Sequence, residues 1–246
     1  MNRIEQQWTG CRWRRFSHKT YAVFRSLHRE VSIGVLGVAM LSSCAFVNPQ
    51  GELSDKLERG DLLFCYETDD DGGLGGAIAA VTEGAEQLNI THVAVMMDDV
   101  RVLEATPRGG VRVINLSEFL KDAGSLPDGT PRVLASRLQD TTGVARSVER
   151  ALTYVGRPYD FLYQPDDSAV YCSELVQLSF QRLDGTSVFE QQPMSFRDST
   201  GEIAPYWVKL YADHQMEVPE GLPGTNPGAL SRSSKVRKLY VSFPPN

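Results

Sequence analysis

Short runs of β-branched and aromatic residues, bounded by glycine, proline or aspartate, follow one another from residue 58 to residue 138. This pattern is typical of buried strands. The runs occupy residues 61–67, 90–97, 100–105, 110–116 and 131–138, and a further run closes the chain. Because Asp98 and Asp99 separate the second run from the third, these two runs are predicted to form a β-hairpin.

Residues 141–156 carry apolar side chains every three or four positions, which is the spacing of an amphipathic helix. Thr141 or Thr142 can cap the start of this helix, and Gly156 is placed to end it before a proline. The predicted apolar face consists of Val144, Val148, Ala151, Leu152 and Val155.

A second helical stripe begins at Cys172 and is predicted to continue to Leu183, after which Gly185 acts as a stop signal. The apolar residues of this stripe are Leu175, Val176, Phe180 and Leu183. The thiol of Cys172 is therefore expected in, or just before, the first turn of a helix.

The order of the predicted elements is a strand, a short helix, several antiparallel strands, two longer helices and a closing strand. Helices that are separated from the strands in this way are typical of the α+β class, in which they pack against one antiparallel sheet. The chain of 246 residues is 41% hydrophobic, which is enough for one ordinary core.

The N-terminus differs in composition from the rest of the chain. Residues 1–30 contain seven arginines and lysines but only two glutamates, and an apolar run from Val31 to Leu41 follows. This combination marks a secretory signal, because the run is shorter than the roughly 20 residues that span a bilayer. A short membrane anchor or a buried helix is the alternative. The closing "LSSC" resembles the bacterial lipobox, and that resemblance implies acylation of Cys44.

We therefore divide the chain into a lipoprotein signal (1–43), a linker (44–57) and one catalytic domain (58–246). Without its signal the chain has 18 basic and 29 acidic residues and a net charge of −11. Such a chain repels phosphates, so no nucleic acid partner is expected. It also lacks a polybasic cluster, so we expect lipid on Cys44 to anchor it in the bacterial cell envelope, on the periplasmic or extracellular face.

Two thiols and two histidines remain in the predicted domain, namely Cys65, Cys172, His92 and His214. Two cysteines cannot build a disulfide framework, although the sequence does not exclude a single disulfide between Cys65 and Cys172. No ligand pair has metal-binding spacing, so neither a metal nor another cofactor is expected. Cys65 lies inside a predicted strand, where we expect a small buried hydrophobe.

Cys172 is the candidate nucleophile. The unpaired N–H groups and the positive end of the dipole at a helix N-terminus both favour a thiolate. His92 is the candidate base, although a lone histidine in a strand is more often structural and a buried cysteine can simply fill space. His214 is expected to be an ordinary exposed helix residue.

Glu104 interrupts the apolar strand that is predicted to pair with the strand of His92, and it is the candidate for orienting the imidazole. A two-residue turn would pair residue 92 with residue 105 and place Glu104 on the opposite face of the sheet. A three-residue turn would pair 94 with 104, making His92 and Glu104 diagonal neighbours roughly 7–8 Å apart at Cα. The catalytic hypothesis needs the second register. Asn115 is the alternative orienting residue.

Five short motifs resemble the YiiX-type branch of the NlpC/P60 superfamily. In chain order they are "GDLLF", "THVAV", "VLEATPRGGV", "GRPYDFLY" and "VYCSELV". They extend from Gly60 to Phe180, and the segment from Met194 to Ser233 also resembles that branch. The cysteine helix follows the other motifs here, which is the circularly permuted order.

The resemblance implies a circularly permuted papain-like NlpC/P60 fold with Cys172 as nucleophile, His92 as base, Glu104 as orienting residue and Tyr159 near the oxyanion. It also implies a cysteine hydrolase that cleaves an amide or peptide bond through a thioester, with cell-wall peptides as the first expectation. One alternative is a lipid acyl hydrolase or acyltransferase that resembles lecithin:retinol acyltransferase. The other is a lipoprotein that uses the fold as a non-catalytic binding module.

We predict that Cys44 becomes an acylated N-terminus, because "LSSC" closes an apolar segment that is too short to span a bilayer. Mass spectrometry of the protein from its native bacterium should find residues 1–43 absent and lipid attached to Cys44. An intact N-terminus or an unmodified Cys44 would contradict the lipoprotein hypothesis.

Overall fold

The computed structural model describes residues 53–68, 72–166 and 168–243, so the predicted signal and Cys44 lie outside the described residues. Within these three ranges, no helix is long and apolar enough to cross a bilayer. The elements are, in chain order, β1 (Leu62–Glu67), α2 (Leu74–Val81), η2 (Ala85–Gln87), β2 (Asn89–Met96), β3 (Arg101–Thr106), β4 (Gly110–Asn115), α3 (Leu116–Asp122), β5 (Val133–Leu138), α4 (Val144–Leu152), α5 (Cys172–Ser179), β6 (Gln192–Pro193), α6 (Pro205–Asp213), β7 (Pro223–Gly224), α7 (Pro227–Ser231) and β8 (Val236–Val241).

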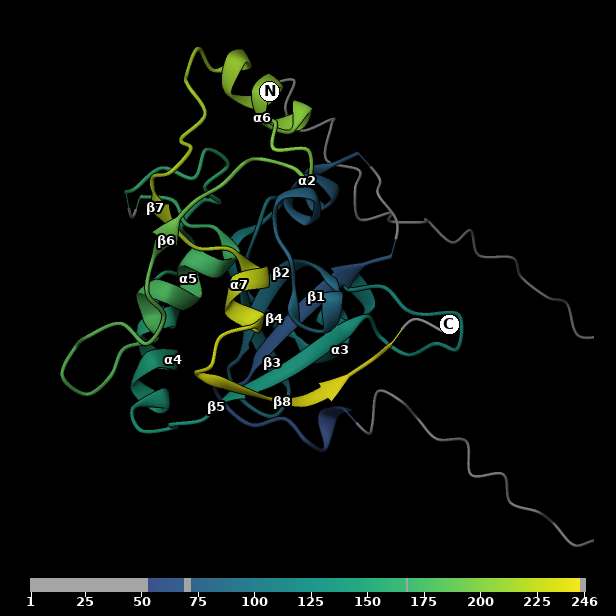
Figure 1. The fold of residues 1–246 in the computed structure, drawn as a ribbon. Helices are drawn as coiled ribbons and strands as arrows, with labels where there is room; N and C mark the ends of the chain where they lie inside the picture. The colour runs from purple at the N-terminus through teal and green to yellow at the C-terminus, as the bar shows by residue number, and fades with distance from the viewer. Residues whose placement is uncertain (1–52, 69–71, 167, 244–246) are drawn as a thin grey trace, which may run out of the picture.

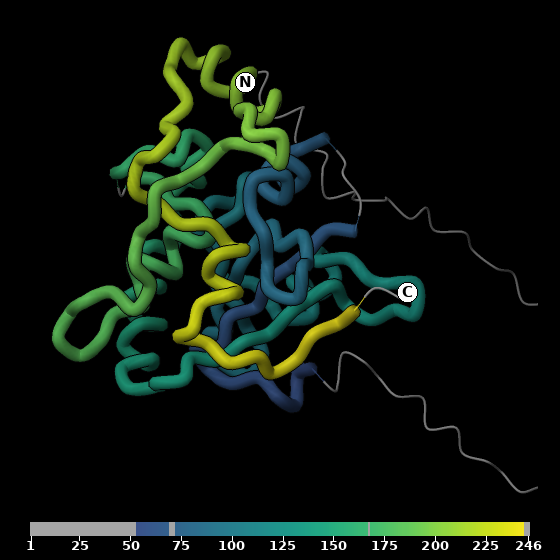
Figure 2. The backbone as a smooth tube through the Cα atoms, viewed as in Figure 1, coloured from purple at the N-terminus to yellow at the C-terminus, as the bar shows by residue number. Residues whose placement is uncertain are grey.

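A six-stranded antiparallel sheet forms the centre of the molecule, with the strand order β4-β3-β2-β1-β5-β8 (Figure 1). The C-terminal strand β8 closes the edge of this sheet beside β5, far from it in sequence (Figure 2). β6 and β7 form a separate two-stranded ribbon. The predicted α+β class, with helices against an antiparallel sheet, is confirmed.

Alternate side chains of the strands pack on opposite faces of the sheet, because the side-chain period of a strand is two. One face, with Phe64, Val93 and Val95, packs against Val176 of α5 and Leu230 of α7. The other face, with Leu63, Ala94 and Met96, packs against Phe119 and Leu120 of α3. Leu53 and Leu57, within the predicted linker, are buried in this second cluster.

Helix α4 is shorter than the predicted helix and is capped differently. It begins after Gly143, whose left-handed backbone (φ +87°) suits glycine, and no threonine side chain caps it. At its end the N–H groups of residues 153–155 donate to carbonyls three residues back, which tightens the final turn. Val155, which was predicted on the apolar face, is therefore turned away from the core and is 47% exposed.

Helix α5 ends at Ser179, so its predicted continuation to Leu183 was wrong. The following residues form a small hairpin, in which residues 181 and 187 pair and Arg182 N donates to the carbonyl of Thr186. Gly185, at φ +86°, lies in the turn of this hairpin. Leu183 is consequently 61% exposed. The glycine marked a tight turn after the helix and not the end of the helix itself.

Candidate active site

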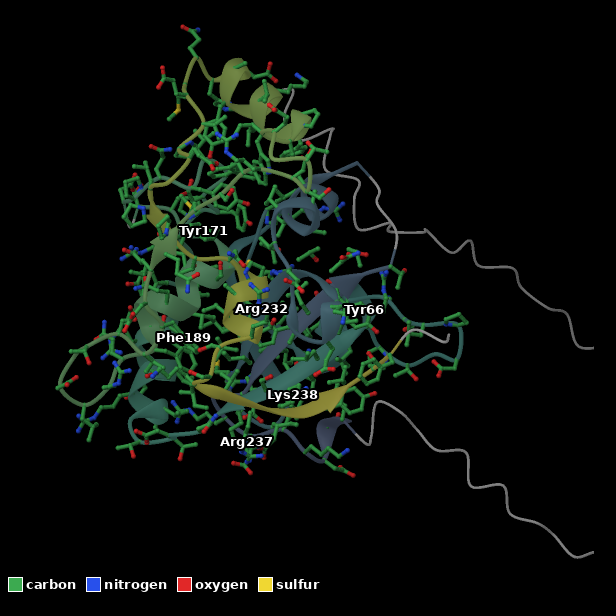
Figure 3. All side chains as sticks on the ribbon, in the orientation of Figure 1. Tyr66, Tyr171, Phe189, Arg232, Arg237 and Lys238 are labelled. Atoms are coloured by element: carbon green, nitrogen blue, oxygen red, sulfur yellow. The ribbon has the colours of Figure 1, made fainter. Side chains whose placement is uncertain are left out.

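Cys172 is the first residue of α5 and is buried, with 3% of its surface exposed. The start of the helix is fixed by the preceding residue, because Tyr171 N donates to Glu174 Oε2 (3.3 Å). Thr225 N, between β7 and α7, donates to Tyr171 Oη (3.1 Å), which ties this helix start to the C-terminal segment. Tyr171 is labelled in Figure 3. The predicted placement of the thiol in a first turn, where N–H groups lack intrahelical partners, is confirmed.

His92 lies in β2 beside a β-bulge. Cys65 of β1 pairs with His92, but the next residue of β1 pairs with Ile90, so that Thr91 is an extra residue. A bulge re-aims the side chains around it. Ile90 accordingly joins the cluster that contains α5, whereas the imidazole of His92 lies toward α3, with its ring centroid 6.3 Å from that of Phe119.

Glu104 lies on the same face of the sheet as His92. The register of β2 and β3 pairs Ala94 with Glu104, which is the arrangement that the catalytic hypothesis requires. His92 Nε2 is hydrogen-bonded to Glu104 Oε2 at 2.8 Å. The other carboxylate oxygen, Oε1, accepts hydrogen bonds from Arg112 Nε (3.0 Å) and Nη2 (2.8 Å). The buried carboxylate therefore has a partner on each oxygen.

The strands β2 and β3 are paired over only three positions, from Ala94 to Met96, although both strands extend further. They separate beyond this stretch, and α5 contacts both of them. Across this opening Cys172 lies close enough to His92 to raise the pKa of the imidazole. Since Nε2 of the ring is held by Glu104, Nδ1 is the nitrogen that remains for the thiol.

The partners of His92 determine its charge. Burial alone would lower the pKa of His92, but its hydrogen bonds to Cys172 and Glu104, together with the negative charge of these partners, raise that pKa to about 10. Burial acts to raise the pKa of Glu104, yet the hydrogen bond to His92 and the positive charges of His92 and Arg112 bring it below its usual value. At neutral pH the site therefore holds an imidazolium beside a carboxylate. Such shifted values are typical of functional sites.

Tyr159 lies between α4 and α5 and lines the same small cavity as Cys172. Its segment is tied to β4, because Val111 N donates to the carbonyl of Arg157 (2.9 Å). Gly110 (φ +58°) permits this approach, since a Cβ there would lie 2.2 Å from the same carbonyl oxygen. Burial and then the charge of Cys172 raise the pKa of Tyr159 well above its usual value, so the hydroxyl keeps its proton and can donate it in a hydrogen bond.

The remaining candidates lie away from this site. Asn115 pairs with Arg101 at the opposite end of β3 from Glu104. His214 follows α6, is partly buried and donates from Nδ1 to the carbonyl of Leu210 (2.8 Å), so its expected exposure was wrong. Cys65 and Cys172 are both free thiols, and Cys65 is buried, as expected.

Arg112 is a member of the site that escaped prediction. It stands directly opposite Glu104 in the β3–β4 pair. The short turn at residues 107–109 implies this pairing. The position of Arg112 opposite Glu104 could therefore have been derived from the register of the β3–β4 hairpin. No sequence pattern indicated that Tyr163 and Trp207 line the same cavity, because Tyr163 lies in a loop and Trp207 lies in α6.

The chain matches the Peptidase_C92 family, described as permuted papain-like amidase enzymes of the YaeF/YiiX type, over residues 56–240. Its fold is similar to the crystal structure of the metalloprotein YiiX from Escherichia coli O157:H7, with a TM-score of 0.59 and 20% sequence identity over 77% of this chain and 99% of that chain. No curated protein sequence matches the chain. Among the described residues of this chain, no three His, Cys, Asp or Glu side chains form a group that could hold a metal ion.

The family match covers the strands that carry His92 and Glu104 and the helix that begins at Cys172. The cysteine helix follows these strands in the sequence, as the permuted description of the family requires. The chain therefore belongs to the Peptidase_C92 family of permuted papain-like amidases and is a papain-like cysteine hydrolase.

Proposed function

We propose that the chain hydrolyses an amide bond through a thioester, with Cys172 as nucleophile, His92 as general acid and base, and Glu104 as positioning residue. One observation carries this proposal. The three side chains come from α5, β2 and β3: His92 is hydrogen-bonded to Glu104, and Cys172 lies close enough to His92 to raise the pKa of the imidazole. A nucleophile, a base within hydrogen-bond reach and a group that orients the base are the arrangement that covalent catalysis requires.

The reaction proceeds in two halves. The sulfur of Cys172 attacks the carbonyl carbon, and the carbonyl electron pair moves to oxygen to form a tetrahedral intermediate. This intermediate collapses as His92 donates its proton to the leaving amine, and an acyl thioester on Cys172 remains. His92 then takes a proton from water, the resulting hydroxide attacks the thioester, and the carboxylic acid leaves as the sulfur is restored.

Tyr159 is the side-chain candidate for stabilising the oxyanion of both tetrahedral intermediates. Its hydroxyl is protonated and buried in the cavity wall beside Cys172. The backbone N–H of Cys172, at the start of α5, is the second donor. Donors that are already oriented in a site shielded from water stabilise developing charge without further reorganisation.

The physiological substrate that we propose is an amide in a cell-wall peptide, hydrolysed outside the cytoplasm by a lipid-anchored enzyme. The support for this location is the signal-like segment and the "LSSC" sequence before the described residues. Without the signal the chain has a net charge of −11, which disfavours polyanionic partners such as nucleic acid.

We predict that Cys172→Ser folds normally but loses turnover of amide substrates by on the order of 10³-fold or more, because a hydroxyl is a far weaker nucleophile in a site arranged for sulfur. Release of amine from a peptide amide library, together with circular dichroism, measures both properties. Cys65→Ala is the matched control, since Cys65 is the other buried free thiol of the described chain. It should retain turnover. Full activity of Cys172→Ser would rule out the proposed nucleophile.

We predict that Glu104→Gln lowers kcat by roughly 10²-fold, within the range that a general base contributes. The amide removes the negative charge that helps His92 to keep its proton. The pKa of His92 therefore falls, and the basic limb of the pH–rate profile moves to lower pH by roughly one unit or more.

The matched control for this experiment is Glu118→Gln, which removes an exposed carboxylate from the neighbouring helix α3. Its pH–rate profile should coincide with that of the wild type. If Glu104→Gln also left the basic limb in place, Glu104 would have no role in holding the imidazolium.

A further inference from the structure

A small cavity of about 40 Å³ adjoins Cys172 on the side formed by α5, α6 and the segment before α7. Its walls combine aromatic and aliphatic side chains with neutral polar ones, and no Asp, Glu, Lys or Arg side chain of the described residues lines it. The lining residues that matter here are Tyr159, Tyr163, Cys172, Ser173, Trp207 and Thr225.

The position of His92 shows which part of a substrate this cavity receives. His92 lies on the sheet side of Cys172 and does not line the cavity. The leaving amine must be near His92, because it takes a proton from the imidazolium. The acyl portion of the substrate then extends from Cys172 in the other direction, into the cavity.

Four buried polar atoms in the cavity wall have no well-formed hydrogen bond within the described part of the chain. They are Trp207 Nε1, Tyr163 Oη, Ser173 Oγ and Thr225 Oγ1. Trp207, Tyr163 and Ser173 are 2%, 8% and 0% exposed, so bulk solvent does not reach their side chains freely. The Tyr163 hydroxyl lies next to that of Tyr159, but without good hydrogen-bond geometry. Buried polar groups are normally paired, and an indole N–H can be satisfied only by an acceptor.

The backbone that presents Tyr163 is an independent indication of a binding role. Tyr163 has a left-handed backbone, φ +51°, which is unusual for a bulky residue. The buried carboxylate of Asp160 holds this conformation by accepting hydrogen bonds from Leu162 N (2.8 Å) and Gln164 N (2.6 Å). Tyr211 Oη also donates to the carbonyl of Leu162 (2.9 Å). Strain that is maintained in this way is concentrated at functional sites.

We infer that this cavity is a specificity pocket for a neutral group that bears a hydrogen-bond acceptor, such as a carboxamide, on the acyl side of the scissile amide. The acceptor oxygen binds Trp207 Nε1, and the remaining polar atoms bind the hydroxyls of Tyr163 and Ser173. A charged group is rejected, because the described lining residues offer no opposite charge and burial of an unpaired charge is costly. This inference rests on the proposed function.

The test uses N-acetylaminoacyl acyloxymethyl ketones, which alkylate a nucleophilic cysteine, with Gln, Leu, Glu or Lys as the variable side chain. The second-order rate of Cys172 alkylation in the full chain is measured by mass spectrometry. The Gln probe should react about tenfold faster than the Leu probe, as expected for a gained hydrogen bond, and the Glu and Lys probes should be slower than both.

Trp207→Phe keeps an aromatic ring but removes the N–H, so the Gln-to-Leu ratio should fall to within about twofold. Tyr163→Phe should lower the same Gln-to-Leu ratio. This second variant provides a test even if Trp207→Phe does not fold. The matched control is Tyr206→Phe, because Tyr206 contacts the Trp207 ring (5.0 Å between centroids) but does not line the cavity. It should leave the ratio unchanged.

The outcomes separate this inference from the proposed function. If all four probes alkylate Cys172 at similar rates, or if the Leu or a charged probe reacts fastest, the specificity pocket is refuted and the nucleophile stands. A Gln-to-Leu ratio that is unchanged in both Trp207→Phe and Tyr163→Phe refutes it as well. If no probe alkylates Cys172, the proposed function and the inference fall together.

Discussion

The buried carboxylate of Glu104, held between Arg112 and His92, is the interaction on which the rest of the site depends. Removal of a carboxylate from water costs several kcal/mol unless the charge is paired and its oxygens are hydrogen-bonded. Arg112 meets part of this requirement with two N–H groups on one oxygen. The other oxygen is left for a single partner, His92. This bond restrains the orientation of the imidazole, leaves Nδ1 available to other partners and stabilises the positive charge of the ring.

This arrangement follows from the geometry of the sheet. The Ala94–Glu104 register places the carboxylate on the same face as the imidazole, and a slip by one residue would move it to the other face. The bulge at Thr91 sets the direction of His92, and the separation of β2 from β3 beyond the paired stretch leaves space for the first turn of α5. A continuous, regular sheet at this point would separate the thiol from the base.

The strands could be predicted because alternation and turn residues are local properties of the sequence. The register could not, since the Asp98–Asp99 turn is compatible with two pairings. The structure has the longer turn, in which Asp98 Oδ1 accepts hydrogen bonds from Val100 N and Arg101 N. The end of α5 was misplaced because Gly185 is an equally good signal for a helix stop and for a hairpin turn. The role of Tyr163 was invisible, because its left-handed backbone is imposed by hydrogen bonds to a carboxylate and not by a favourable residue type.

The central claim is that Glu104 and Cys172 together hold His92 as an imidazolium, and NMR titration of its ring nitrogens tests this claim most directly. In the intact protein the account predicts that His92 stays protonated through neutral pH and titrates with a pKa of about 10. Titration near the ordinary value of 6.5 would contradict it, because the interactions with Glu104 and Cys172 would then do no more than offset the effect of burial on the ring.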